Sequence, residues 1–449
     1  MTDRRIRTLR ERRWRGKDPV TATGSSRPTT DARTGRLPAA LSRARAGVVT
    51  WFDDVIRPDP RVRPVTRRDL VGVTWIWVIG RVLSLAMLAI WYGFSKAFSW
   101  SFGAQGLPVG DFLSFLTAWD ADRYGRISRI GYPAELPVDT TGAVFPNDWA
   151  FMPIFPVLER WVSDATGWGW QLSGVLLGIL FSAGATIMLF LLLRAVTAPS
   201  QARWAVILFS FGPLSFIFMV AYAESLFLFL LFLGLWLAVR RRYAWIAPVG
   251  VLAAYTRPGA LVLALALGIV FLVRWARHRI DPFPRGQVIG LIVAGVSIAA
   301  AGLSWSWIVE ITTDLPHAYV LTETSWWRPF LGPVQFVPLT PWFLFAWNFL
   351  GVFGILIVLA VIAAFALFVW SKPFRRLGLV IGVYTVSYGL YLFAVFLPQQ
   401  SLFRLLLPVA PLLGHEKLSS SRAWRRVTLG TAIGSQLLAT LVLWTVGYP

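Results

Sequence analysis

Long apolar segments recur along this chain from residue 70 onward, and they constrain its fold more than any other feature. A helix needs about 20 apolar residues to cross a membrane. Hydrophobic residues make up 56% of the 449 residues, as expected of a chain surrounded mainly by lipid. We therefore predict an all-α, polytopic transmembrane helix bundle. Its eleven candidate spans are 70–95, 171–193, 204–222, 223–239, 244–256, 258–273, 287–310, 343–370, 377–397, 401–414 and 427–446.

Two of these spans are short for a full crossing. The segments 244–256 and 401–414 are therefore candidates for half-helices or re-entrant segments. We predict a helix break at residues 256–258, because Pro258 disfavours helix at the residue before it. One long helix through 244–274 would reverse the orientation of every later segment.

The connections between the candidate spans differ in charge. With the amino terminus inside, the alternation of eleven spans brings all the basic connections to the cytoplasmic side, as the positive-inside tendency favours. These connections contain Arg194, Arg203, Arg240 to Arg242, Arg274, Arg277, Arg279, Arg285, Lys372, Arg375, Arg376, Lys417, Arg422, Arg425 and Arg426. Most acids fall on the other side, so we expect polar chemistry in two long outer loops, near 96–170 and 311–342.

Residues 1–68 form a separate basic segment, with 18 of the 43 Lys and Arg and no sustained apolar period. We predict a disordered cytoplasmic tail that touches anionic membrane lipids, followed by a transmembrane domain over 69–449 in the plasma membrane. No recognition motif accompanies the net charge of +21, so a nucleic-acid partner is not expected. The chain has no Cys and three His, so a metal centre or other cofactor is not expected either.

The outer segment 119–124 (WDADRY), followed by 131–133 (GYP), places two carboxylates two residues apart between apolar spans. Charged groups near hydrocarbon are costly, so such a cluster is a candidate functional site. A carboxylate there can act as a general base if it reaches a hydroxyl within hydrogen-bonding distance. For the Asp122 side chain there are three alternative roles: it orients Asp120, binds a cation, or simply faces water.

Four further motifs follow in order: AFMPIFPVL at 150–158, AYAESL at 221–226, LAAYTRP at 252–258 and FRLLLP at 403–408. Together with WDADRY and GYP, this set resembles the PIG-V type of mannosyltransferase, a family of the GT-C glycosyltransferases. The resemblance covers roughly residues 70–415. It leaves out the basic tail and the last apolar segment.

The resemblance implies transfer of mannose, or another hexose, from a polyprenyl phosphate donor to an acceptor hydroxyl at the outer membrane face, with inversion at the anomeric carbon. In that reaction Asp120 would be the general base, with Asp122 as the second carboxylate of the catalytic pair. Substrate contacts would come from Trp119, Arg123, Tyr124 and Glu224. For Glu224 the alternative is a helix cap, where a negative side chain is favoured by the helix dipole.

The leaving group in such a transfer is a lipid phosphate, whose growing charge is best stabilised by cations. Arg257 and Arg404 are the strongest candidates, since each lies near a proline at a helix boundary within a family-like motif. His317 is the third, as the outward-facing His. The alternative for both arginines is snorkelling toward lipid headgroups.

Other features leave the acceptor and the function class open. Animal members of the family commonly have His and Phe in place of Arg123 and Tyr124, so the acceptor does not follow from the resemblance. An excess of Arg over Lys indicates a bacterial source, and hence a lipid-linked glycan, an envelope glycolipid or a secreted polypeptide as acceptor. The alternative function is a transporter or flippase of a lipid-linked glycan, which predicts charges near the membrane midplane. Arg81 is the charge well inside a span, where pairing with an acid or snorkelling would explain it.

Overall fold

A computed structural model describes residues 64–103 and 106–447 of the chain. This part is almost entirely helical, and its strands are limited to the short antiparallel pair β1 (Ser101–Phe102) and β2 (Leu107–Pro108). The prediction of an all-α protein is therefore confirmed. The predicted disordered tail, apart from residues 64–68, lies outside the described residues.

Six helices in the described part are long and apolar enough to cross a membrane, which indicates a membrane protein. They are α2 (Arg67–Ala97), α6 (Trp170–Arg194), α10 (Leu261–Ala276) with the turn η4 (Pro258–Ala260), α11 (Arg285–Thr313), α14 (Pro341–Trp370), and α17 (Arg422–Ala439) with η8 (Thr440–Val446). Shorter segments lie among them: α7 (Pro199–Phe211), α8 (Glu224–Val239), α9 (Ile246–Ala254), α16 (Leu379–Val395) and the 3₁₀ segment η6 (Arg404–Gly414). The count of eleven spans stays a prediction.

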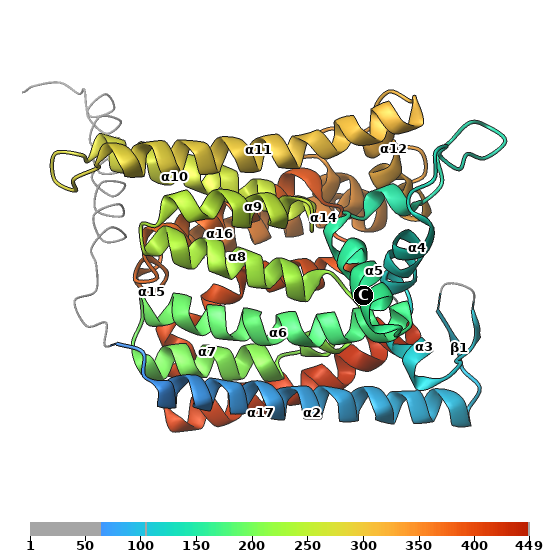
Figure 1. Ribbon diagram of the computed structural model, residues 1–449, viewed down its shortest axis with the longest axis horizontal. Helices are drawn as coiled ribbons and strands as arrows, with labels where there is room; N and C mark the ends of the chain where they lie inside the picture. Colours follow the sequence, from blue (N-terminus) through green and yellow to red (C-terminus); the bar gives the residue numbers. More distant parts are fainter. Residues whose placement is uncertain (1–63, 104–105, 448–449) are drawn as a thin grey trace, which may run out of the picture. The chain divides into compact units, whose positions relative to one another are not determined.

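The helices lie side by side with their axes roughly aligned, and some neighbouring pairs are parallel while others are antiparallel (Figure 1). Helix α2 packs on α7, α7 on α6, α6 on α8, α8 on α9, and both α9 and α10 on α11. Short helices gather at one end, which we call the loop end: α3 (Phe112–Leu116), α4 (Asp120–Ile130), α5 (Ile154–Thr166) and α12 (Ala318–Ser325). The opposite end holds the basic connections, including α15 (Lys372–Arg375), and we call it the basic end.

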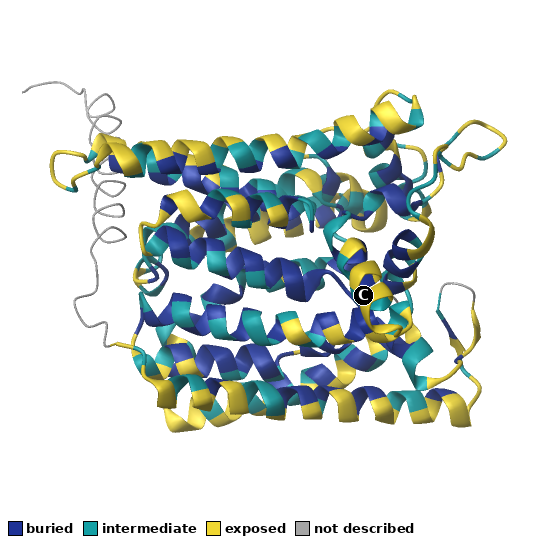
Figure 2. Cartoon of the chain, in the orientation of Figure 1, coloured by how far each residue is buried: buried dark blue, intermediate teal, exposed yellow. Residues whose placement is uncertain are grey.

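Burial follows the position of each helix in this arrangement. Figure 2 shows α8 almost wholly buried in the middle, whereas α2 and α11 expose one side along most of their length. Helix α14 is the least buried of the six long helices, with Pro341, Gly354 and Val358 as its buried residues. Apolar surface exposed along whole helices is suited to lipid contact rather than to water.

The predicted span 204–222 is not one helix, which corrects that assignment. Helix α7 ends at Phe211, and a proline at 213 precludes its continuation before the short 3₁₀ turn η2 (Ser215–Met219). Arg81 of α2 donates hydrogen bonds to the carbonyls of Ser210 (3.0 Å) and Ser215 (2.6 Å) on either side of this break. Its side chain is buried and faces backbone oxygens, so the two explanations by acid pairing and by snorkelling are both wrong.

The predicted helix break at residues 256–258 is confirmed. Helix α9 ends at Ala254 and η4 begins at Pro258, so residues 255–257 break the helix as expected. Arg257 has the extended backbone (φ −156°, ψ 147°) typical of a residue before proline. Residues 404–414 form a 3₁₀ segment, because Pro408 and Pro411 interrupt α-helical hydrogen bonding.

Candidate functional site

Asp120 is the first residue of α4, at the loop end. The preceding Trp119 has φ 58° and ψ −122°, a conformation that a bulky residue rarely adopts and that is often found at functional sites. The Trp119 indole donates to the carbonyl of Trp444 (3.0 Å), and the backbone N–H of Asp120 donates to the Tyr222 hydroxyl (3.2 Å). These two contacts hold the start of α4 in place.

Four charged side chains meet at this point, and we call them the charge cluster. Asp120 forms an ion pair with Arg404, and Glu224 forms one with Arg257. Arg404 also lies 3.7 Å from Glu224 and 5.7 Å above the ring of Tyr222. All four are largely buried, with exposed side-chain fractions from 5% for Glu224 to 20% for Asp120. Two carboxylates and two guanidiniums balance in formal charge.

Each member of the charge cluster lies at the end of a helical segment. Glu224 begins α8, Arg404 begins η6, and Arg257 directly precedes η4 and α10. Helices α8 and α9 stop short of the loop-end termini of α2 and α11, and α4 and α5 lie at this end of the unit (Figure 1). Glu224 makes no side-chain hydrogen bond to its own helix start among the described residues, but it is the acid in the first turn of α8, where the helix dipole favours a negative charge.

Two buried polar atoms of the charge cluster have no hydrogen-bond partner among the described residues. They are Nε of Arg404 and Oε2 of Glu224. A buried polar atom without a partner is costly, and most such atoms are satisfied by protein, water or ligand. The cluster therefore has unused capacity to donate and to accept hydrogen bonds.

Tyr124 lies one turn along α4 from Asp120 and borders the cluster. It is buried, and its ring contacts those of Phe151 and Phe155 edge-on, at centroid distances of 5.2 Å. It interacts electrostatically with Arg257, which places its hydroxyl near the cluster. Tyr124 thus borders the charge cluster on one side and packs into the hydrophobic core on the other, with little exposed surface.

Three residues predicted for the site are engaged elsewhere or exposed. Asp122 is exposed and has no side-chain partner among the described residues, because residues two apart on a helix face different sides. It therefore does not orient Asp120. Arg123 instead pairs with Asp148 (3.1 Å), and His317 is 84% exposed and 3.8 Å from Glu310.

A further helix, from the segment between α11 and α14, packs at the loop end. Helix α12 packs against the turn η1 (Asp148–Ala150), and the Asn147 amide donates to the Thr322 hydroxyl (3.0 Å). The ring of Trp326, just after α12, lies 5.9 Å from the Arg123 guanidinium. These contacts join two loop-end segments that are far apart in the chain.

Glu323 of α12 is the residue that the sequence did not reveal. It is partly buried and interacts electrostatically with both Arg257 and Asp120. Burial raises the pKa of Glu323 to about 7, Asp120 adds to the rise, and Tyr319 and Arg257 oppose it. A carboxyl group with this pKa is partly neutral near pH 7, so it can also donate a hydrogen bond. No motif marks it; the available signal was an acid three residues before a pair of Trp in a long loop between apolar spans.

No protein-family model matches this chain, and no curated protein matches it significantly. In the described ranges, no group of three or more His, Asp or Glu is placed to hold a metal ion. The cluster itself offers a carboxylate that can accept a proton, beside two guanidiniums that can bind an anion.

Proposed function

We propose that the protein is an integral membrane glycosyltransferase. It moves mannose, or another hexose, from a polyprenyl phosphate donor to an envelope glycolipid, glycan or polypeptide. The observation that carries this proposal is the Asp120–Arg404 ion pair with Arg257 and Glu224 beside it. Such a cluster combines a proton acceptor and an anion-binding pair in one place.

The origin of the four residues supports the same activity. Asp120 comes from WDADRY, Glu224 from AYAESL, Arg257 from LAAYTRP and Arg404 from FRLLLP. Each member of the charge cluster therefore belongs to a different motif of the PIG-V resemblance. Motifs spread over nearly 300 residues contribute to one site, as a shared chemical task would require.

In the proposed reaction, an acceptor hydroxyl attacks the anomeric carbon on the face opposite the phosphate. Asp120 takes the hydroxyl proton as the new bond to carbon forms, and the bond from carbon to the phosphate oxygen breaks. The electron pair of that bond leaves with the polyprenyl phosphate. Arg404 and Arg257 stabilise its added negative charge, as cations at an oxyanion do.

The resting ion pair gives donor binding a second effect. While Arg404 is paired with Asp120, the carboxylate is engaged; a phosphate that shares this guanidinium loosens the pair. The freed carboxylate oxygen can then meet the acceptor hydroxyl. Donor binding and activation of the base are thereby coupled through one side chain.

The position of the cluster favours a transferase over a transporter or flippase. Its four residues stand at the starts of α4, α8 and η6 and just before η4, not inside the long helices α2, α6, α11 and α14. Arg81, a charge in the middle of α2, is committed to backbone carbonyls. A transporter is expected to keep ionisable groups near the midplane for its cargo.

We further propose that the loop end faces the outside of the plasma membrane and that the amino terminus is cytoplasmic. The basic end carries Arg240 to Arg242 and Lys372 to Arg376, which the positive-inside tendency places in the cytoplasm. The donor would reach the site within the membrane by its lipid tail.

Incubation of membranes containing the protein with radiolabelled polyprenyl-phosphate mannose and a lipid extract tests this proposal. We expect label to move to a new lipid or polypeptide product in the wild type and not in Asp120→Asn. Donors carrying other hexoses test the sugar. The proposal would be contradicted by protein-dependent movement of the donor across vesicles without any transfer of label.

A further inference from the structure

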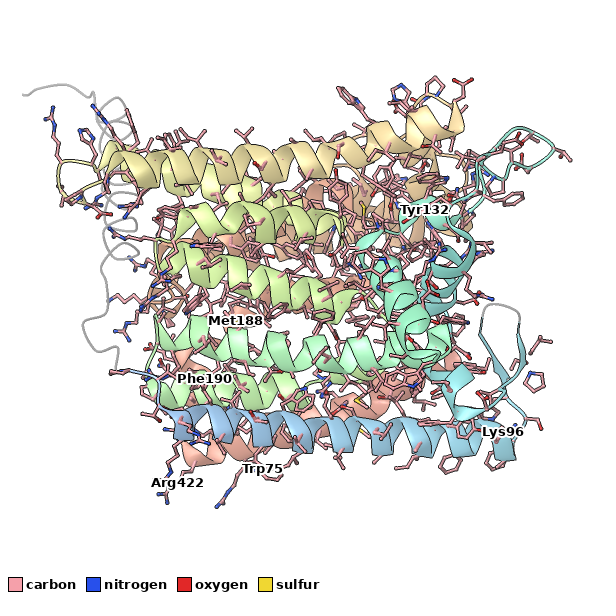
Figure 3. The ribbon with its side chains drawn as sticks, in the orientation of Figure 1. Trp75, Lys96, Tyr132, Met188, Phe190 and Arg422 are labelled. Carbon is pink, nitrogen blue, oxygen red and sulfur yellow. The ribbon has the colours of Figure 1, made fainter. Side chains whose placement is uncertain are left out.

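A pocket with three arginines among its lining residues lies at the basic end, away from the charge cluster. It has a volume of about 280 Å³ and lies between α7 and the amino-terminal half of α17. The pocket is lined by Trp204 and Leu429 and by Arg422, Arg425 and Arg426. Arg422 begins α17 at this end (Figure 3). We call it the α7–α17 pocket.

The three arginines of the pocket are not neutralised by its other lining residues, none of which is acidic. Arg425 is held in place, because its guanidinium donates twice to the Ser419 carbonyl (3.1 and 2.8 Å) and lies 5.8 Å above the ring of Trp204. Arg422 and Arg426 are exposed and make no side-chain ion pair or hydrogen bond with another described residue. Their charge adds to the positive dipole end of α17.

Trp204 provides an independent sign of a missing partner. It is 9% exposed, and its indole N–H has no acceptor among the described residues. Buried indole N–H groups usually find a hydrogen-bond partner. This nitrogen has almost no exposed surface, so a ligand oxygen in the pocket would reach it only after the indole turned toward the pocket.

The pocket changes from basic to apolar along the helices. Leu429 lies seven residues beyond Arg422, or about 10 Å along α17. Trp204 belongs to an apolar cluster with Leu208 and Ala432, which continues in the same direction. A ligand that fits this gradient has an anionic head and an apolar tail.

We propose that the α7–α17 pocket binds an anionic phospholipid. Its phosphate lies among Arg422, Arg425 and Arg426, and its acyl chains follow Leu429 and the face of Trp204. A lipid bound in this way links α17 to α7. The site is at the opposite end from the charge cluster, so the inference does not depend on the proposed transferase activity.

Lipid binding to the purified full chain tests the proposal. The protein in dodecyl maltoside is titrated with phosphatidylglycerol or phosphatidylcholine, and retained lipid is counted by native mass spectrometry while Tm is followed in parallel. The test variant is Arg422→Gln with Arg426→Gln, which leaves Arg425 and its contact to Ser419 intact. The control is Arg240→Gln with Arg279→Gln, which removes the same charge from exposed positions at the basic end.

We expect phosphatidylglycerol, but not phosphatidylcholine, to raise Tm of the wild type and of the control. In the test variant the affinity for phosphatidylglycerol should fall by about tenfold or more, since each surface cation contributes substantially to anionic-lipid binding. Trp204→Phe, which keeps the ring and loses the N–H, should weaken binding less. Inorganic phosphate should not replace the lipid.

Two results would overturn the proposal. Equal losses in test and control variants would mean that the basic end attracts anionic lipid without a defined site. An equal rise in Tm with inorganic phosphate would mean that the pocket binds a free anion. Either result is obtained with folded protein, because both pairs of substitutions are at exposed positions.

Discussion

Asp120 and Arg404 lie 284 residues apart in the chain and form an ion pair inside the charge cluster. Neither side chain is a free surface charge, as their exposed fractions are 20% and 13%. Loss of one partner therefore leaves the other partly buried, with Glu224 at 3.7 Å as the remaining partner of Arg404. Every substitution at this pair acts on stability as well as on chemistry.

Arg404→Lys keeps the charge and shortens the reach to a phosphate. We expect kcat/KM for a polyprenyl phosphate donor to fall by about 10²–10³, since removal of one oxyanion donor typically has this effect. Initial rates over a range of donor concentrations measure it. Arg123→Lys is the matched control, because Arg123 pairs with Asp148 outside the cluster. Equal donor kinetics in both variants would reduce Arg404 to a structural residue.

Glu323 makes stability depend on pH. Its pKa rises from 4.5 to about 7 on folding, so the folded protein holds more protons than the unfolded chain between these pH values. The free energy of unfolding should therefore fall as pH rises through that window. We expect the loss of Tm between pH 5 and pH 8 to be smaller in Glu323→Gln than in the wild type. Glu310→Gln serves as a control; the same pH dependence in wild type and Glu323→Gln would contradict the burial of this carboxyl.

Gly125 allows α4 to approach the start of α6. A Cβ atom at Gly125 would lie 2.2 Å from the ring of Trp170, so Gly125→Ala must displace this ring or one of the two helices. We expect a loss of about 1–3 kcal/mol in stability, together with reduced transfer, because α4 carries Asp120. Gly72→Ala in α2 meets nothing within 4 Å and should be neutral or stabilising. Thermal unfolding in detergent compares the two, and an unchanged Tm for Gly125→Ala would contradict this packing.

Orientation is tested by reporters fused to the chain. A reporter after Arg242 or Arg376 should be cytoplasmic, and one near Glu135 should be external. Glu135 belongs to the segment between α4 and α5 at the loop end. Cytoplasmic activity of the Glu135 fusion would rule out a site on the outer face.

Much of the fold was predictable from local signals. Apolar runs located the long helices, and Pro258 located the break between α9 and α10. The break after α7 was visible too, since Gly212 and Pro213 stand in the middle of the predicted span 204–222. It was missed because the apolar residues on both sides hide it in a hydropathy pattern.

The site was predictable only in part. Motif order identified Asp120, Glu224, Arg257 and Arg404, but their pairing is a tertiary contact that no local pattern contains. Asp122 could in principle have been distinguished from Asp120 by sequence. Once a helix starts at residue 120, side chains two positions apart face different sides of it. The role of Glu323 could not be predicted from the sequence, because its burial comes from the packing of α12 on η1.

Asp148, which like Asp120 lies between α2 and α6, provides a structural control for the assignment of Asp120 as general base. Asp148 is 7% exposed and pairs with both Arg123 and Arg126, so Asp148→Asn also breaks a buried ion pair. Asp120→Asn and Asp148→Asn should both lower stability, by about 1–3 kcal/mol each. The loss at Asp120 is larger than expected for an exposed loop acid, because its partner is largely buried.

Transfer of radiolabelled mannose by folded Asp120→Asn, Asp122→Asn and Asp148→Asn protein is the most direct measurement. We expect Asp120→Asn to lose about 10²–10⁴ in rate, as removal of a general base does. Asp122→Asn should stay close to wild type, since its side chain is exposed and unpaired among the described residues. Asp148→Asn should lose no more activity than its lowered stability explains. Near wild-type transfer by Asp120→Asn would contradict the account, and a selective loss in Asp122→Asn would move the base to Asp122.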